Sequence, residues 1–270
     1  MKLKFFFGKL YRWVLYTLIY NKVNAKLFFP NGYPKMINGQ KIRVPFNHSL
    51  FYSDVYEQGK SVFIKSHCKA GDTVIDIGAH MGIFSFIMAR QVGEKGKVYS
   101  FEPAALTFNV LRKTIAFNKL TDIVEARQQA VSSFQGNLEF YIYNNSEISN
   151  GNSISSHNTT GTSQKTIVSC TTLDELFVKE KLKDLTLVKI DAEGAELDIL
   201  KGGKKLFTTF RPFITLEVHP KSFDNPNAAM VELFDTIMLF GYRVFKDNDL
   251  LSKQEFCACP NYFEVVLIPG

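Results

Sequence analysis

Residues 74–82 read Val-Ile-Asp-Ile-Gly-Ala-His-Met-Gly, and this stretch decides the fold class. A short β-branched run passes into a turn with glycines at 78 and 82, and a helix-like run over 83–91 follows. A buried strand, a glycine turn and a helix in this order are typical of nucleotide-binding α/β sheets. We expect the glycines to let the backbone approach a ligand, while the helix N-terminus favours a carboxylate or phosphate group.

The spacing of this turn separates two classes of cofactor. The dinucleotide fingerprint G-x-G-x-x-G needs a glycine where this chain has Asp76, and the spacing that remains is D-x-G-x-x-x-G. That spacing favours S-adenosylmethionine over NAD, although a plain turn explains the glycines as well. The residues expected around the donor at this turn are Asp76, Gly78, Ala79, His80, Gly82 and Ser85.

An acidic residue ends the next apolar run, KVYSF, in the dipeptide Glu102-Pro103. A carboxylate at this place accepts hydrogen bonds from both ribose hydroxyls of a bound nucleoside. The alternative is a solvated carboxylate at a strand end, but Glu102 follows the glycine turn by one crossover. We therefore assign Glu102 and Pro103 to the cofactor site.

Two later apolar runs, LVKI and FITLEV, also end in polar side chains. The first leads into Asp191 and Glu193, with Lys189 on the same side of the strand as Asp191, and the second leads into Glu217 and His219. Ligands of open α/β sheets bind at the carboxyl ends of the strands, so these side chains are expected to face the cofactor crevice. We take all five as catalytic candidates, with His219 or Glu217 as the base. Asp191 and Glu193 are expected to orient the acceptor or the donor's amino group. A charge-compensated cluster and a satisfied turn histidine are the alternatives.

The order of strand-like and helix-like runs predicts a doubly wound α/β fold. We expect a seven-stranded, mostly parallel sheet with helices on both faces, interrupted by an inserted strand pair at 137–143 and 166–170 and closed by a hairpin near the C-terminus. The polar segment 144–165 between the inserted strands either covers the acceptor or is plain disorder, and its His157 either contacts substrate or is solvated. The expected domains are an N-terminal basic, aromatic, helical extension over 1–52 and the α/β domain over 53–270.

The composition limits the classes of protein. With 46% hydrophobic and 21% charged residues, the 270-residue chain can bury one compact core. Its four cysteines include no CxxC pair, so we expect neither a disulfide framework nor a structural zinc site, and a reducing cytoplasm fits. We assign no residue to a metal, and the sequence leaves metal dependence open. Residues 1–30 combine basic and aromatic side chains in a run too short to span a membrane; they either lie on the inner membrane surface or pack on the domain.

Together, the motifs VIDIGAHMGIFS, FEP, LVKIDAEGAELDIL-KGG and ITLEVHP resemble the FkbM family of methyltransferases, in order and spacing, over residues 70–220. The polar segment SNGNSISSHNTTG is also similar to a segment that such proteins carry before the DxEGxE motif. The resemblance implies a Rossmann-like class I methyltransferase fold with S-adenosylmethionine as donor. It also implies O-methylation, often of a sugar or a polyketide hydroxyl, so the expected partner is a small-molecule or glycan acceptor.

The sequence is also compatible with three other functions. An NAD-dependent oxidoreductase shares the strand, the glycine turn and the acidic ribose contact. A membrane-associated binding protein with an inactive methyltransferase fold agrees with the basic N-terminus. A nucleic-acid-binding module is suggested by the net charge of +6, but no basic stripe runs through the α/β part, and we expect no nucleic-acid partner. The oligomeric state is undetermined.

Overall fold

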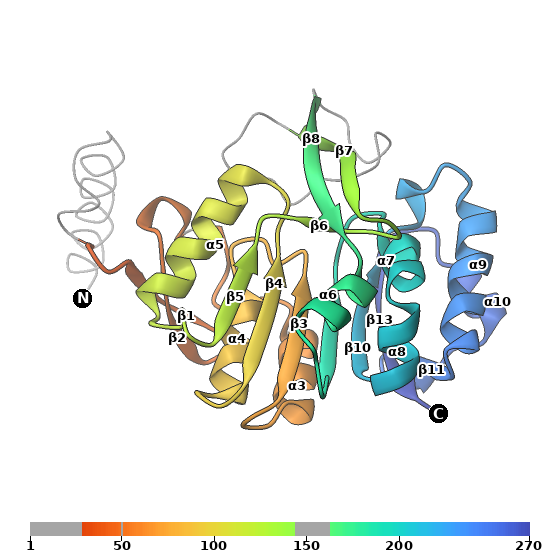
Figure 1. The fold of residues 1–270 in the computed structure, drawn as a ribbon, viewed down its shortest axis with the longest axis horizontal. Helices are drawn as coiled ribbons and strands as arrows, with labels where there is room; N and C mark the ends of the chain where they lie inside the picture. The colour runs from red at the N-terminus through yellow and green to blue at the C-terminus, as the bar shows by residue number, and fades with distance from the viewer. Residues whose placement is uncertain (1–28, 50, 144–162) are drawn as a thin grey trace, which may run out of the picture.

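The structure is a computed structural model that describes residues 29–49, 51–143 and 163–270. Its central sheet has the strand order β12-β11-β13-β10-β9-β3-β4-β5 (Figure 1). Neighbouring strands from β5 to β10 pair in parallel, whereas β13, β11 and β12 are antiparallel. The strands are β3 (Thr73–Ile77), β4 (Lys97–Phe101), β5 (Val124–Arg127), β9 (Leu187–Ile190), β10 (Phe213–Val218), β11 (Tyr242–Lys246), β12 (Asp249–Leu250) and β13 (Phe263–Pro269).

The predicted Rossmann-like sheet is therefore confirmed, with eight strands in place of seven. The additional strand is β12, which has two residues and pairs with β11 through Phe245 and Leu250. Such a short edge strand has no periodicity of its own, because its conformation depends on the partner strand. The predicted closing hairpin corresponds to β11 and β13, which flank β12 in sequence.

Helices cover both faces of the sheet, and the side chains of the parallel strands alternate between the two layers. Val74, Val98 and Leu187 pack with one set of helices, whereas Ile75 and Val188 pack with the other set. The first set is α3 (Gln58–His67), α4 (Ile83–Val92) and α5 (Ala105–Phe117). The second set is α6 (Leu173–Lys179), α7 (Glu196–Gly202), α8 (Lys204–Phe210), α9 (Pro226–Leu239) and α10 (Lys253–Cys257). Short 3₁₀ turns lie at Phe46–His48 and Pro220–Ser222.

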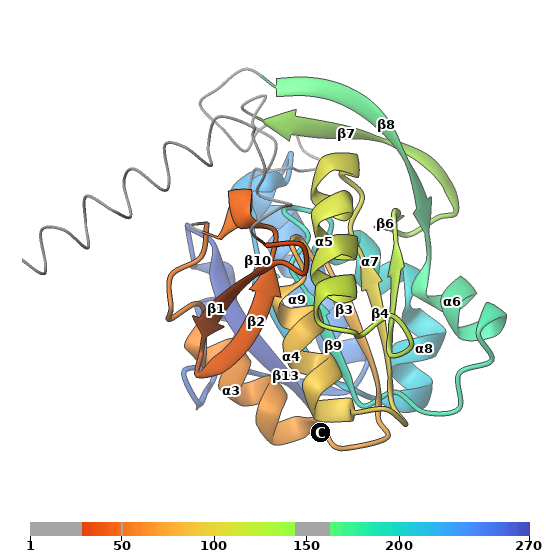
Figure 2. The ribbon, with the colours of Figure 1, turned by 90° about the vertical axis from the view of Figure 1, so that its left-hand side faces the viewer.

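The inserted strands form a small second sheet with the order β6-β8-β7. Its members are β6 (Ala130–Val131), β7 (Gly136–Tyr143) and β8 (Ser163–Thr171). The predicted strand pair is thus present as β7 and β8, and β6 pairs with β8 as a third strand. Figure 2 shows β7 and β8 extending across the top of the central sheet. The central part of the polar segment, residues 144–162 with His157, lies outside the described residues.

The N-terminal part of the described chain differs from the predicted helical extension. Tyr33–Ile37 (β1) and Gln40–Val44 (β2) form an antiparallel hairpin. Asn38 and Gly39 form its turn with φ values of 48° and 75°, as a two-residue hairpin turn of the Asn-Gly type requires. Residues 1–28, with the proposed membrane-surface helix, lie outside the described residues. Within the described ranges, none of the helices has the length and apolar character needed to cross a bilayer.

Candidate active site

A cavity of about 510 Å³ opens at the carboxyl ends of the parallel strands. The predicted site residues that line it are Gly78, His80, Glu102, Pro103, Asp191, Glu193, Glu217 and His219. The predicted residues outside its lining are Asp76, Ala79, Gly82, Ser85 and Lys189. The topology thus brings the ends of β3, β4, β9 and β10 to one crevice, as expected for an open α/β sheet.

The Glu102 carboxylate is fixed at the end of β4. Its Oε2 accepts a hydrogen bond from the His80 N–H at 3.0 Å, and its Oε1 accepts one from the Ala104 N–H at 2.9 Å. Burial raises the pKa of Glu102 to about 7, although these two hydrogen bonds lower it. Each carboxylate oxygen keeps a further lone pair, so Glu102 remains able to accept the hydroxyls of a ribose.

The glycine turn after β3 does not present its N–H groups to the cavity. Gly78 and Ala79 both donate to the carbonyl oxygen of Phe101, at 3.0 and 2.9 Å, and the following N–H is bound to Glu102. These three donors are therefore already used, whereas the predicted binding of a carboxylate or phosphate at the N-terminus of the following helix stays a prediction. Gly78 cannot carry a side chain, because a Cβ atom there would lie 1.7 Å from the Asp191 carbonyl oxygen. Its φ of 70° is a second reason why this position requires glycine.

Lys189 and Asp76 form a buried polar layer beneath the cavity. The Lys189 ammonium donates to the Gly78 carbonyl oxygen at 2.9 Å and lies 3.2 Å from an Asp76 carboxylate oxygen and 3.6 Å from Asp191. The other Asp76 oxygen accepts the Ser85 hydroxyl at 2.6 Å. Since Asp76, Ser85 and Lys189 are each at most 1% exposed, they position the loops above them and do not line the cavity.

A second buried ammonium, that of Lys60 on α3, was not anticipated from the sequence. Its side chain is fully buried, with carboxylate oxygens of Glu57 at 2.5 Å, Glu217 at 3.0 Å, Glu264 at 3.8 Å and Asp191 at 4.0 Å. Burial lowers the pKa of Lys60, but these carboxylates raise it overall. The lysine therefore stays charged and holds four acids from separate segments of the chain together.

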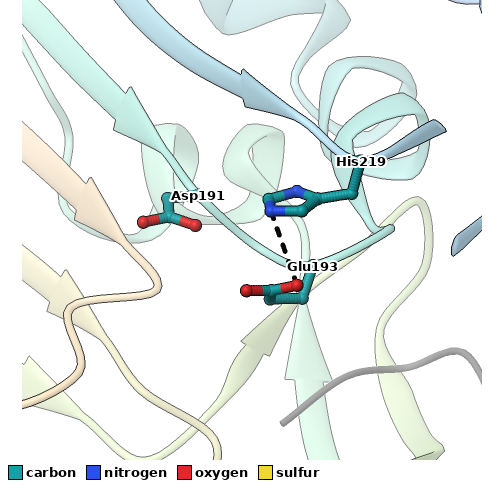
Figure 3. Close-up of side chains that lie close together, drawn as sticks. All are labelled: Asp191, Glu193 and His219. Atoms are coloured by element: carbon teal, nitrogen blue, oxygen red, sulfur yellow. Dashed lines mark ion pairs between the residues drawn. The ribbon is translucent and has the colours of Figure 1, made fainter. Parts of the chain in front are cut away.

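His219 is surrounded by carboxylates. Its Nδ1 lies 2.8 Å from Glu196 Oε1, and its Nε2 lies 3.4 Å from both Glu193 and Glu217; Figure 3 shows the contact with Glu193. Burial lowers the pKa of His219, but the neighbouring carboxylates raise it to about 11. This arrangement favours the protonated imidazole, which argues against His219 as the general base that the sequence suggests.

The carboxylates of the cavity differ in proton affinity. Burial raises the pKa of Glu217, but His219 and Lys60 lower it overall to about 2, which makes this second predicted base a weak one. Burial raises the pKa of Glu193 to about 8 and that of Glu264 to about 7. Carboxylates that titrate near neutral pH are suited to general base catalysis.

Glu264 and Tyr262 are further residues that sequence reasoning missed. Glu264 pairs with Glu217 across β13 and β10, which places two acids side by side at the cavity. An acidic residue inside the otherwise apolar run FEVVLI was the available signal. Tyr262 is 73% exposed, and its ring is stacked at 6.3 Å from the His219 ring, so it adds an apolar surface to the cavity wall.

The comparisons with known proteins identify the family. A model of the FkbM methyltransferase domain matches residues 76–244, which include β4, β9, β10 and the last two residues of β3, while β13 lies outside the match. The chain belongs to this family. The FkbM domain is thus a class I methyltransferase domain that uses S-adenosylmethionine, as predicted, and the oxidoreductase alternative is wrong.

Several individual proteins are similar to the FkbM domain. The methyltransferase sdnD of Sordaria araneosa is 28% identical over 157 residues, which are 48% of this chain and 59% of that protein. The chain thus spans less than two thirds of this relative. Among solved structures, an O-methyltransferase from Bacillus cereus in complex with SAH is 14% identical with a TM-score of 0.47, covering 78% of this chain and 80% of the other. Methyltransferase FkbM from Methylobacillus flagellatus is 12% identical with a TM-score of 0.46, covering 78% and 50%.

Proposed function

We propose that this protein transfers the methyl group of S-adenosylmethionine to a hydroxyl oxygen of a carbohydrate or glycan. The observation that carries the proposal is the group of acids that shares one cavity with the ribose-binding candidate Glu102, namely Asp191, Glu193, Glu217 and Glu264. Carboxylates accept hydrogen bonds and a protonated carboxyl group also donates one, so these acids suit the hydroxyl groups of a neutral polyol. The exposed ring of Tyr262 offers an apolar face at the same place.

The residues present fit the donor. S-adenosylmethionine supplies an electrophilic methyl group on a positively charged sulfur when it is bound. Glu102 is placed to hold the ribose, and the acids around Asp191 offset the positive charge of the donor. The engaged N–H groups of the glycine turn do not favour a pyrophosphate, which agrees with a nucleoside ligand over a dinucleotide.

The remaining requirement is a group that takes the proton of the hydroxyl, because a sugar hydroxyl is a poor nucleophile at neutral pH. Glu264 is our choice for this base. It lines the cavity, and Lys60 holds it beside Glu217. Methyl transfer is an in-line displacement, so the other acids chiefly align the acceptor oxygen.

The test is direct detection of the product. The purified protein is incubated with S-adenosylmethionine and with two panels, one of neutral glycans and one of amino sugars, and products are analysed by mass spectrometry for the gain of one methyl group. Carbon NMR then distinguishes an O-methyl from an N-methyl carbon. The proposal expects an O-methyl product on at least one glycan; an exclusively N-methylated product from an amino-sugar panel would overturn it.

A further inference from the structure

We propose that Asp191, Glu193 and His219 bind a divalent metal ion in the cavity. One ligand atom from each residue lies within 4.8 Å of the other two. Figure 3 shows the three side chains converging from the loop after β9 and the end of β10. This inference deepens the proposed methyl transfer and rests on it for its purpose, although the binding of a metal is measurable without any reaction.

The donor set suits such an ion. Two carboxylate oxygens and one imidazole nitrogen form a mixed oxygen and nitrogen site, which divalent ions such as Mn²⁺ and Zn²⁺ accept. The ion would displace the proton from His219 Nε2, because a metal-binding imidazole is neutral. Ligand atoms that each bind one ion at about 2.1 Å lie roughly 3 Å apart when adjacent and roughly 4 Å apart when opposite. The distance of 3.4 Å between His219 Nε2 and Glu193 Oε2 falls within this range.

A second observation comes from the other side of the imidazole. Glu196 is fully buried, and its Oε1 lies 2.8 Å from His219 Nδ1 while it also accepts the Gly194 N–H at 3.0 Å. A carboxylate behind a histidine is the usual partner of a metal-binding imidazole, because it fixes the ring and makes the other nitrogen more basic. Its Oε2 has no hydrogen-bond partner within the described residues, so this buried acid is committed to the histidine and the turn before α7.

The neighbouring group of three acids does not compete for the ion. Glu57, Glu217 and Glu264 also offer oxygens within 4.8 Å of one another. However, the Lys60 ammonium lies 2.5, 3.0 and 3.8 Å from these acids and already offsets their negative charge. In the first group, Asp191 lies 3.6 Å from Lys189 and 4.0 Å from Lys60, and neither contact is as short as the contacts of Lys60 with Glu57 and Glu217. The structure therefore assigns the metal to the group that contains the histidine.

The ion would bind the acceptor. Three protein ligands leave coordination positions for hydroxyl oxygens, and a bound cation lowers the pKa of such a hydroxyl. In the reaction, the O–H proton passes to the Glu264 carboxylate, the O–CH₃ bond forms, and the S–CH₃ bond breaks with its electron pair left on sulfur. The class of ligand implied is a neutral acceptor that carries adjacent hydroxyl groups.

The test uses the full chain with Mn²⁺ alone, without donor or acceptor. Electron paramagnetic resonance follows the free Mn²⁺ signal during titration, and circular dichroism confirms that each variant is folded. We expect saturable binding at one site in the wild type, and a loss of at least tenfold in affinity in both Asp191→Asn and His219→Gln. The matched control is Glu264→Gln, which alters the neighbouring acidic group and should keep wild-type affinity for Mn²⁺.

Two outcomes would overturn the metal site: no saturable binding by the wild type, or an equal loss of affinity in Glu264→Gln and Asp191→Asn. If Asp191→Asn does not fold, Glu193→Gln takes its place with the same expected loss. Because no methyl transfer is measured, failure of the metal site is distinct from failure of the proposed O-methylation, which the product analysis decides.

Discussion

Single residues of the cavity have separable roles, and Glu102 is the one assigned to donor binding. The His80 and Ala104 N–H groups fix its carboxylate. Glu102→Ala removes the acceptor of the ribose hydroxyls, and a hydrogen bond to a charged group contributes about 1.5–3 kcal/mol. We therefore expect the Kd for S-adenosylmethionine to rise roughly 10- to 100-fold in isothermal titration calorimetry. Asp122→Ala, in the exposed turn before β5, is the control and should leave the Kd unchanged. Wild-type affinity in the Glu102 variant would rule out the ribose contact.

Glu264 is assigned to proton transfer, and its titration predicts a pH profile. Burial raises the pKa of Glu264 to about 7, so the carboxylate is protonated below this pH and unable to accept the hydroxyl proton. With saturating donor, kcat should fall about tenfold per pH unit below pH 7 and level off above it. Glu264→Gln should lower kcat by roughly 10²- to 10⁴-fold and abolish this acidic limb. If the variant keeps the wild-type profile, another group is the base.

At the scale of elements, the contact between the ends of β3 and β9 depends on a glycine. Gly78 and Gly93 have similar positive φ values of 70° and 63°, but a Cβ atom would meet Asp191 only at Gly78, and nothing lies within 4 Å at Gly93. Gly93→Ala should cost about 1–3 kcal/mol from backbone strain alone, since its φ of 63° and ψ of −168° form a conformation that side chains avoid. Gly78→Ala should cost more than about 3 kcal/mol, because the backbone must also move. Urea unfolding measures both; equal losses would show that the steric contact is unimportant.

The elements that sequence reasoning located share one property. The parallel strands β3, β4, β9 and β10 are apolar runs because both of their faces are covered, and a glycine follows β3 whereas a polar residue follows each of the others. The strand β5 was not predicted, because its sequence VEAR contains the ion-paired Glu125 and Arg127 and is therefore not an apolar run. The β1–β2 hairpin was also missed, although its Asn-Gly turn is a recognised hairpin signal.

At the scale of the whole molecule, the site is assembled from segments that are distant in sequence. Strand-end residues were predictable because the parallel topology brings all carboxyl ends to one edge of the sheet. Lys60 was not, since its burial depends on α3 packing against acids from β10 and β13. The sequence could not show that His219 is disfavoured as the base, because three carboxylates that stabilise its protonated form surround it only in the folded chain. The sequence contains no metal-ligand spacing that predicts the proposed metal site, because Asp191 and His219 follow different strands and are 28 residues apart.

The charge of the whole chain and that of its cavity have opposite signs, which leads to a last prediction. The formal net charge is +6, yet the acids that line the cavity are Glu57, Glu102, Asp191, Glu193, Glu217 and Glu264. Their field should attract the sulfonium of S-adenosylmethionine, and salt should screen that attraction. S-adenosylhomocysteine has the same nucleoside and amino-acid groups without the positive sulfur, so it is the matched control. Between 20 and 500 mM KCl, we expect the Kd of the donor to rise roughly fivefold and that of the product to change little. Calorimetric titrations that show the same salt dependence for both ligands would mean that these acids do not act on the sulfur, and that their charge is balanced by Lys60 and Lys189 within the fold.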